Sequence, residues 1–369
     1  MTGRTDAAEC TARVPEPLVG KTHTELLALA QEFGMPRFAA GQMAQWLYRK
    51  RATSIEAMTN LSKAQRAVLA ERYAVGLTPP ADVAESADGT KKYLFRTASG
   101  RYVETVYIPD GERATLCVSS QVGCKMGCLF CMTGKQGFDG NLTAAEILNQ
   151  ILSVPESERL TNIVMMGMGE PLDNAGPVLT ALEVLTAPWG LGWSPHRITL
   201  STIGHLGHLP AFLERTDCHL AVSLHSPFAD ERLELMPVER AYPTADVLDL
   251  LRRYDFAHQR HLTFEYIVFR GLNDDARHAR ALVRLLAGID CKVNLIRFHA
   301  IPDDGRTHSR LHVSDLHTTD LEAMERFRDI LCRHGLTATI RASRGEDILA
   351  ACGMLSSLRQ HKGSAATEG

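Results

Sequence analysis

The chain has 369 residues, of which 45% are hydrophobic, and a formal net charge of −3. This length suffices for one large domain and a smaller one, and the near-neutral charge argues against a generic DNA or RNA coat protein but not against a local basic surface. No apolar run reaches the roughly 18 residues of a membrane span, and residues 1–19 lack the apolar core of a signal peptide. Nine cysteines, an odd number, predict a reducing, cytoplasmic location rather than a disulfide scaffold.

The first part of the chain predicts a tail followed by a small helical module. Residues 1–20 show no periodic pattern and are expected to be disordered. A capping box at Thr22 opens a first helix, and further helices are expected over residues 39–50 and 63–73. This module, residues 21–78, is locally basic. Its charge fits either an RNA contact or an ordinary solvated helical surface.

The next segment, residues 79–113, is predicted to form a β-hairpin extension, with strands at residues 92–97 and 101–108. A strand at residues 114–119 then leads into a cysteine-rich loop. Further strands are expected at residues 163–166, 197–201, 219–224, 262–268, 293–298 and 337–341. Helical patterns lie between them, at residues 177–185, 206–213, 244–254, 275–286 and 319–333. This alternation predicts parallel βαβ units that form a barrel or partial barrel over residues 114–355, followed by a tail at residues 356–369.

Cys124, Cys128 and Cys131 follow the spacing C-x-x-x-C-x-x-C. Closely spaced thiolates from one short loop are typical ligands of iron–sulfur clusters. Three cysteines would leave one iron of a four-iron cluster without a protein ligand, free to bind and reduce a small molecule. The alternatives are a structural zinc site, which needs four ligands and finds no second pair here, or three unrelated buried thiols.

Three other motifs fall at the ends of predicted strands, where the chemistry of barrel folds is located. Gly167-Met168-Gly169-Glu170 follows an apolar strand, so backbone can approach a ligand closely and Glu170 can accept hydrogen bonds from an amine or a ribose. Ser201 ends the next strand, and Ser223-Leu224-His225 ends the one after it. Glycine turns and loop histidines are common, so neither would indicate a ligand site by itself.

Together, the cluster loop, the Gly-Glu turn and the βα alternation resemble the radical S-adenosylmethionine superfamily. More specifically, the chain resembles the RlmN-type dual-specificity RNA methyltransferases over residues 20–355. The segments that carry this resemblance are residues 103–109, 113–124, 164–171, 199–202, 344–347 and 351–353.

The resemblance implies an α/β fold, a partial (β/α)6 radical-SAM barrel with a small N-terminal helical module and a β-hairpin extension. It implies methylation of carbon 2 of an adenine in 23S ribosomal RNA and of an adenine beside the anticodon in transfer RNAs. The cofactors would be a [4Fe-4S] cluster and S-adenosylmethionine, two molecules of the latter for each methyl group. An electron donor such as a flavodoxin would be needed, with no membrane partner, and the protein would be monomeric.

The resemblance also assigns roles to residues. Cys124, Cys128 and Cys131 would bind the cluster, while Cys352 would be methylated first and Cys117 would resolve a protein–RNA adduct through a transient disulfide with it. Glu104 matches the position of a proton acceptor. The contacts to S-adenosylmethionine would come from Gly169, Glu170, Ser201, Ser223, Leu224, His225 and His299. Many relatives carry asparagine where His299 stands, and an imidazole offers fewer hydrogen bonds than an amide.

Without the resemblance, Cys117 and Cys352 would be interpreted as core thiols and Glu104 as a solvated strand position. Two other functions remain open at this point. One is methylation of carbon 8 of the same ribosomal adenine, which gives antibiotic resistance and uses the same cysteines. The other is a non-catalytic, metal-binding or redox-sensing RNA-binding protein.

Overall fold

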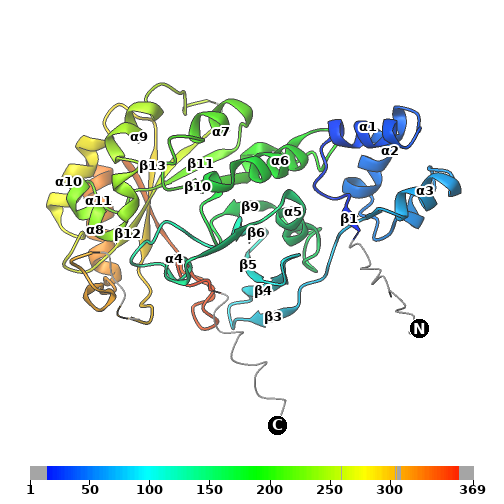
Figure 1. Cartoon of the computed structure of the whole chain (residues 1–369). Coiled ribbons are helices and arrows are strands. Elements are labelled where there is room, and N and C mark those ends of the chain that lie inside the picture. The colour runs from blue at the N-terminus through cyan, green and yellow to red at the C-terminus, as the bar shows by residue number, and fades with distance from the viewer. Residues whose placement is uncertain (1–14, 259, 304, 306–308, 357–369) are drawn as a thin grey trace, which may run out of the picture.

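A ten-stranded sheet forms the centre of the fold, with strand order β14-β13-β12-β11-β10-β9-β6-β5-β4-β3 (Figure 1). The structure is a computed structural model that describes residues 15–258, 260–303, 305 and 309–356. Seven neighbouring strands run parallel: β6 (Arg113–Cys117), β9 (Asn162–Met165), β10 (Ile198–Thr202), β11 (His219–Ser223), β12 (Leu262–Val268), β13 (Lys292–Arg297) and β14 (Thr337–Arg341). The predicted partial barrel is therefore confirmed: six parallel strands are extended by β14 as a seventh, and within the described chain no pairing joins β14 to β3.

Helices lie between successive parallel strands and cover the outer face of the sheet (Figure 1). They form where apolar residues recur at helical spacing, so that one side of each helix is buried. Their bounds are α5 (Ala144–Leu152), α6 (Ala175–Thr186), α7 (Leu209–Arg215), α8 (Ala229–Leu235), α9 (Thr244–Leu251), α10 (Ala276–Leu285) and α11 (Leu321–Arg333). A capping box at Thr143 begins α5, with the Thr143 side chain accepting from the amide of Glu146.

An antiparallel extension continues the sheet on the β6 side. It comprises β5 (Tyr102–Asp110), β4 (Lys91–Arg96) and β3 (Asp82–Glu85). The β4–β5 turn has Gly100 at a φ of 79°, a left-handed conformation that favours glycine. A separate two-stranded sheet pairs β7 (Gln121–Gly123) with β8 (Phe138–Asn141) on either side of the cysteine loop and of the short helix α4 (Met132–Gln136). The extension and the barrel thus share one continuous sheet.

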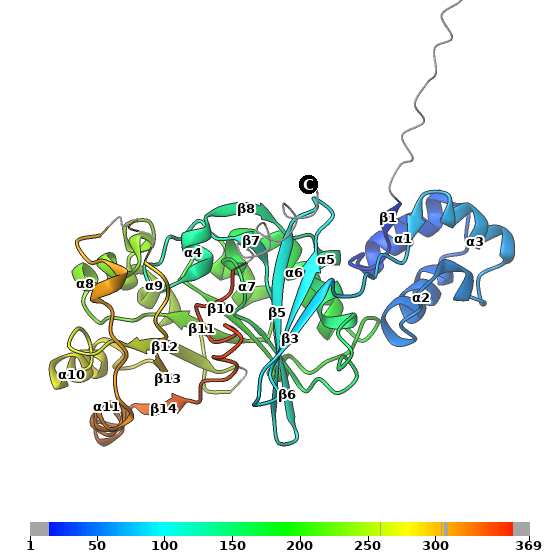
Figure 2. The ribbon, with the colours of Figure 1, turned by 90° about the horizontal axis from the view of Figure 1, so that it is seen from below.

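The N-terminal helices lie beside the barrel, past α5 and α6 (Figures 1 and 2). They are α1 (His23–Glu32), α2 (Phe38–Ala44) and α3 (Lys63–Ala70). The capping box at Thr22 forms as expected, and a second one forms at Ser62. The second helix is shorter than predicted, because a π-helical turn (Gln45–Arg49) replaces its last part.

The expected tail over residues 1–20 is wrong for residues 15–20. There β1 (Glu16–Pro17) pairs with β2 (Tyr73–Ala74), and the apolar side chains of Leu18 and Val19 are buried. The cause is a pairing across more than fifty residues, which no local pattern can indicate. Residues 1–14 and 357–369 lie outside the described residues, and the predicted domain boundaries stay predictions.

Two arginines join the helical module to the barrel. The guanidinium of Arg49 donates to the carbonyl oxygens of Leu191 and Pro188, each at 2.8 Å. That of Arg51 donates to the hydroxyl of Ser157 at 2.6 Å. Both contacts reach loops of the barrel, so the module has a defined place beside the sheet.

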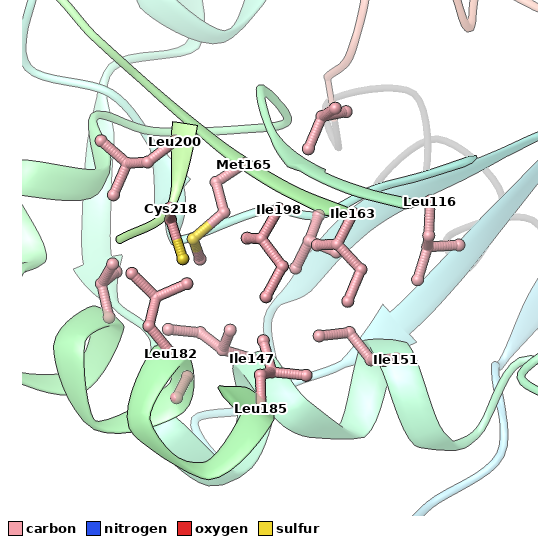
Figure 3. Packing of buried hydrophobic residues seen from close by; sticks show 14 of the residues in the cluster. Leu116, Ile147, Ile151, Ile163, Met165, Leu182, Leu185, Ile198, Leu200 and Cys218 are labelled. Carbon is pink, nitrogen blue, oxygen red and sulfur yellow. The ribbon is translucent and has the colours of Figure 1, made fainter. Parts of the chain in front are cut away.

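Figure 3 shows the part of the main core that lies between the outer face of the sheet and helices α5 and α6. Leu182 and Leu185 of α6 and Ile147 of α5 point toward Ile163 and Ile198 of the strands, and all five side chains are at most 1% exposed. Burial of this apolar area contributes roughly 25 cal/mol per Å² to stability. The core therefore fixes the strands whose ends form the site.

We expect Leu182→Ala to lower the free energy of unfolding by about 2–5 kcal/mol, because it leaves a cavity in this core. Leu321→Ala is the matched control, since Leu321 is 61% exposed on α11. Denaturant unfolding of both variants measures the difference. Equal effects of the two substitutions would contradict the described packing.

Candidate active site

One cavity lies at the carboxyl ends of the parallel strands and holds about 1110 Å³ of space, including the part open to solvent. Carboxyl ends of parallel strands meet at one edge of a sheet, which is why motifs distant in sequence converge there. The cavity brings together ten of the residues predicted to be functional: Cys117, Cys124, Cys128, Cys131, Gly169, Glu170, Ser201, Ser223, His225 and Cys352. Leu224 is buried behind this surface, and Glu104 and His299 lie outside the cavity.

The cysteine loop connects β7 to α4. The loop begins after Gly123, which has a φ of 72°. The backbone of Gly123 lies so close to that of Gly137 that a Cβ at position 123 would be 1.7 Å from the carbonyl oxygen of Gly137. The amide of Leu129 donates to the carbonyl of Leu235 at the end of α8, at 2.9 Å, which fixes the far side of the loop. Any side chain at position 123 would displace the loop.

The three thiols of this loop are held in a setting that disfavours their anions. Burial raises the pKa of Cys124 to about 12, with added repulsion from Cys131, and burial likewise raises the pKa values of Cys128 and Cys131. All three cysteines can be deprotonated together only if bound cations, such as iron ions, compensate their negative charges. Within the described residues no three His, Cys, Asp or Glu side chains are arranged to hold a single metal ion. This thiol-only donor set fits a multi-iron cluster.

Glu170 is one of two acidic groups that line the cavity, and its carboxylate is oriented by three donors. The hydroxyl of Thr202 donates at 2.6 Å, the amide of Ile203 at 3.0 Å and the amide of Leu172 at 3.1 Å. Burial nonetheless raises the pKa of Glu170 to about 7. A buried carboxylate that already accepts three hydrogen bonds is suited to binding a cationic or hydrogen-bond-donating ligand in a fixed direction.

Gly169 precedes Glu170 at a φ of 97°, and a Cβ there would be 2.5 Å from the Cβ of Gln121. The side-chain oxygen of Gln121 accepts from the amide of Glu170 at 2.9 Å. The strand-end turn is therefore packed against β7, at the entrance of the cysteine loop.

His225 adopts the left-handed conformation, with a φ of 58°, which is uncommon for a residue with a side chain. Its Nδ1 accepts from the amide of Ile267 at 3.0 Å, and the Asn273 side chain donates to its carbonyl at 2.8 Å. Burial lowers the pKa of His225 to about 3, so the ring is neutral and its proton is on Nε2. The ring packs edge-on against Phe130, with centroids 4.8 Å apart. His225 thus presents one N–H donor.

Cys117 and Cys352 meet in this cavity although they are far apart in sequence. Cys117 ends β6 and is buried, and burial raises the pKa of its thiol to about 12, assisted by the nearby Cys352 thiol. Cys352 is exposed. Eight of the nine cysteines are described and all eight are free thiols, so the predicted Cys117–Cys352 disulfide is not formed in this structure.

The segment that carries Cys352 follows β14 and is tied to the cluster loop. The amide of Met132 donates to the carbonyl of Gly353 at 2.8 Å, and the hydroxyl of Thr133 donates to the carbonyl of Leu355 at 2.8 Å. The amide of Gly345 donates to the carboxylate of Asp88 at 3.0 Å, which joins the segment to the extension as well. Cys352 is therefore held over the cavity from both sides.

Glu104 supports this same segment. One carboxylate oxygen pairs with Lys92 at 3.0 Å, and the other accepts from the amide of Ser356 at 2.9 Å. The carboxylate is buried in β5 outside the cavity. Its role as a proton acceptor stays a prediction, while its contacts indicate a structural contribution.

His299 lies beside a smaller cavity that also includes Cys352. Its Nε2 is 2.8 Å from the hydroxyl of Ser343, and its Nδ1 is 3.6 Å from the carboxylate of Glu346. Burial lowers its pKa. Both ring nitrogens thus face the Cys352 segment, and the predicted contact of His299 with S-adenosylmethionine stays a prediction.

Sequence reasoning missed Glu265 and Arg341, which line the main cavity. Glu265 accepts from the Asn294 side chain at 3.0 Å through one oxygen, while its other oxygen has no hydrogen-bond partner among the described residues. Burial raises its pKa. The pKa of Arg341 is raised mainly by the charge of the Cys352 thiolate, and both residues line the same cavity. Each is the single charged residue of its strand, β12 or β14, and this was the available signal for both.

Comparisons with known proteins agree with this architecture. The family described as "Radical SAM superfamily" matches residues 118–283, and the "Ribosomal RNA large subunit methyltransferase N-terminal domain" matches residues 17–75. A crystal structure of a radical SAM methyltransferase from Sphaerobacter thermophilus superposes with a TM-score of 0.82 at 40% identity, covering 93% of this chain and 100% of that one.

Proteins similar over nearly the whole chain carry one name. The probable dual-specificity RNA methyltransferase RlmN of Parabacteroides distasonis is 58% identical over 93% of this chain and 97% of its own length. Its counterpart in Porphyromonas gingivalis is 60% identical over 92% and 96%, and the dual-specificity RNA methyltransferase RlmN of Syntrophotalea carbinolica is 43% identical over 90% and 88%. The chain belongs to the RlmN family of radical SAM RNA methyltransferases. That family implies a [4Fe-4S] cluster and S-adenosylmethionine. Among the described helices none is long and apolar enough to cross a membrane.

Cys117 and Cys352 are expected to differ in reactivity. Iodoacetamide should alkylate the exposed Cys352 at least about tenfold faster than Cys117, because the thiolate is the reacting form and burial disfavours it in Cys117. Peptide mass spectrometry of the protein without cluster measures both rates, with exposed Cys332 and buried Cys218 as internal references. Equal rates for Cys117 and Cys352 would contradict the described burial.

Proposed function

We propose that this chain methylates carbon 2 of an adenine in 23S ribosomal RNA and of an adenine beside the anticodon in transfer RNAs. The observation that carries the proposal is the meeting of five cysteines in one cavity: Cys124, Cys128 and Cys131 from one loop, with Cys117 and Cys352 beside them. The names of the relatives support RNA as the substrate.

The chemistry explains why an iron–sulfur protein would perform a methyl transfer. Carbon 2 of adenine is not nucleophilic and cannot attack the methyl group of a sulfonium directly. A carbon radical can add to it. Cys124, Cys128 and Cys131 would hold the cluster and leave one iron without a protein ligand. When bound, the cluster supplies the electron that cleaves S-adenosylmethionine to methionine and a 5′-deoxyadenosyl radical.

The residues at the strand ends would bind S-adenosylmethionine. Glu170 accepts its ammonium group, because that carboxylate is buried and already oriented. Ser201, Ser223 and the Nε2–H of His225 offer hydrogen bonds to the remaining polar groups. The buried turn at Leu224 sets the position of its two neighbours.

The two remaining cysteines would divide the methyl transfer. Cys352, the exposed thiol, is methylated first and then gives up a hydrogen atom from its S-methyl group, so that its methylene carbon bonds to adenine. Two molecules of S-adenosylmethionine are thus used for each methyl group. The adduct radical would give up the carbon-2 proton and one electron, the electron to the cluster. The Cys117 thiolate then attacks the sulfur of Cys352, which breaks the bond from that sulfur to the methylene carbon, and this carbon takes up a proton to become the methyl group of the RNA. The transient Cys117–Cys352 disulfide is reduced by a cellular dithiol before the next turnover. Glu104 is proposed as the proton acceptor, with its carboxylate reaching the site only if the segment around Ser356 moves.

Three further features belong to this proposal. The enzyme acts in the cytoplasm, as a monomer, and receives electrons from a donor such as a flavodoxin. The basic helical module at residues 21–78 contacts RNA. The carbon-8 activity uses the same cysteines, but the relatives are named for dual specificity rather than for antibiotic resistance. Their names also disfavour a non-catalytic RNA-binding protein.

Nucleoside analysis tests the proposal directly. In a strain lacking its own enzyme, expression of this chain should restore 2-methyladenosine in digested ribosomal and transfer RNA, and Cys352→Ala should abolish it while retaining the cluster. Cys218→Ala is the control, because Cys218 lies in the core away from the cavity. Detection of 8-methyladenosine alone would refute the carbon-2 assignment.

Cys117→Ala should instead trap the covalent protein–RNA adduct, because no thiol remains to resolve it. Denaturing gels after a single turnover with a labelled RNA would show a nuclease-sensitive band of higher mass. The double variant Cys117→Ala, Cys352→Ala should give no such band, because the adduct forms on Cys352. A Cys117→Ala enzyme that turns over normally would exclude Cys117 as the resolving thiol.

A further inference from the structure

Arg232 is an arginine in the interior of the barrel domain, and none of the roles above uses it. It lies on α8 (Figure 1), and only 2% of its surface is exposed. Buried charges of this kind are rare unless they are paired and hydrogen-bonded. Arg232 does not line the cavity, so it lies behind the ligand-facing surface rather than within it.

The guanidinium of Arg232 donates to three backbone carbonyls. Its Nε donates to the oxygen of Leu224 at 3.1 Å. Its Nη2 donates to the oxygens of Ile203 at 3.1 Å and Ser223 at 3.0 Å. These carbonyls belong to the ends of two neighbouring parallel strands, β10 and β11. One side chain thereby fixes the two turns that face the cavity.

The positive charge of Arg232 is balanced by Glu239, whose carboxylate pairs with Nη1. Burial lowers the pKa of Arg232, and the Glu239 charge opposes this effect. Glu239 is fixed in turn, because it accepts from the amide of Thr244 at 3.0 Å and from its hydroxyl at 2.8 Å. The guanidinium therefore has a defined position, held from the start of α9.

The same helix also supports the cluster loop. The carbonyl of Leu235, at the end of α8, accepts from the amide of Leu129 at 2.9 Å. Phe130, the next residue of that loop, packs against His225, which follows the carbonyl of Leu224 held by Arg232. The turns of β10 and β11 and the loop of Cys128 and Cys131 thus share one support.

We propose that Arg232 is a positioning residue that holds the turns of β10 and β11 in the conformation that binds S-adenosylmethionine. This inference rests on the proposed function and deepens it. Arginine suits the task because a planar guanidinium presents five N–H donors in a fixed fork, enough for three carbonyls and a carboxylate at once. A lysine offers three donors from one point and cannot reach all four acceptors.

The test compares Arg232→Met and Arg232→Lys with the wild type, all reconstituted with the cluster. Arg277→Met is the matched control. Arg277 lies on α10 and pairs at 3.0 Å with Glu231 of α8, the helix of Arg232, but the side chain of Arg277 is exposed. Calorimetry measures Kd for S-adenosylmethionine, and a filter assay measures Kd for a transfer RNA substrate. Loss of a residue that orients metal ligands typically costs about 10–100-fold in metal affinity, and we expect a similar rise of Kd for S-adenosylmethionine in Arg232→Met and a smaller one in Arg232→Lys. Arg277→Met should stay within about twofold of the wild type, and RNA affinity should not change.

A soluble Arg232→Met enzyme with full iron content and wild-type affinity for S-adenosylmethionine would overturn the inference. If Arg232→Met does not fold, Arg232→Lys decides in the same way. An equal loss of affinity for S-adenosylmethionine and RNA with a lowered melting temperature would indicate a merely structural role, and would also overturn it. Failure of the proposed function is distinguishable, because it would appear as the wrong methylated nucleoside, or none, with the wild type, whereas this inference is judged by the Kd of each variant relative to the wild type.

Discussion

The hydrogen bond from the amide of Met132 to the carbonyl of Gly353 joins two parts of the chain that lie more than two hundred residues apart. On one side is the loop that presents Cys124, Cys128 and Cys131, and on the other is the segment that presents Cys352. Chemistry that uses all four thiols requires this junction, because neither part alone encloses a site. The sheet, the helical cover and the antiparallel extension all contribute to it. The extension does so through Asp88 and Glu104, which bind the Cys352 segment from the opposite side.

The cavity keeps most of its ionisable groups uncharged until a ligand arrives. Burial raises the pKa values of its four buried thiols, raises that of Glu170 to about 7 and lowers that of His225 to about 3. The four thiols are those of Cys117, Cys124, Cys128 and Cys131. Each group is held in place by backbone donors or acceptors, so the site is ordered although it is little charged. A site of this kind is suited to binding a cationic cosubstrate and a cluster without large rearrangement.

The sequence predicted what depends on local patterns. The three-cysteine loop, the capping boxes and the strand-end motifs each occupy a few consecutive residues, and the parallel topology brings them together without further information. Sequence-based prediction missed the features that depend on contacts between residues far apart in the chain. The strand at residues 16–17 pairs with residues 73–74, and Glu104 is held by a segment some 250 residues away. Glu265 and Arg341 were overlooked because single charged residues in apolar strands carry no spacing signal.

The pKa of Glu170 near 7 has a thermodynamic consequence for ligand binding. The raised pKa brings protonation of this carboxyl group close to neutral pH. A cationic amine bound against it favours the ionised form, so binding releases protons in this pH range. The heat of binding must then vary with the ionisation enthalpy of the buffer. The cavity thus exchanges protons with solvent as part of recognition, before any bond to carbon is made.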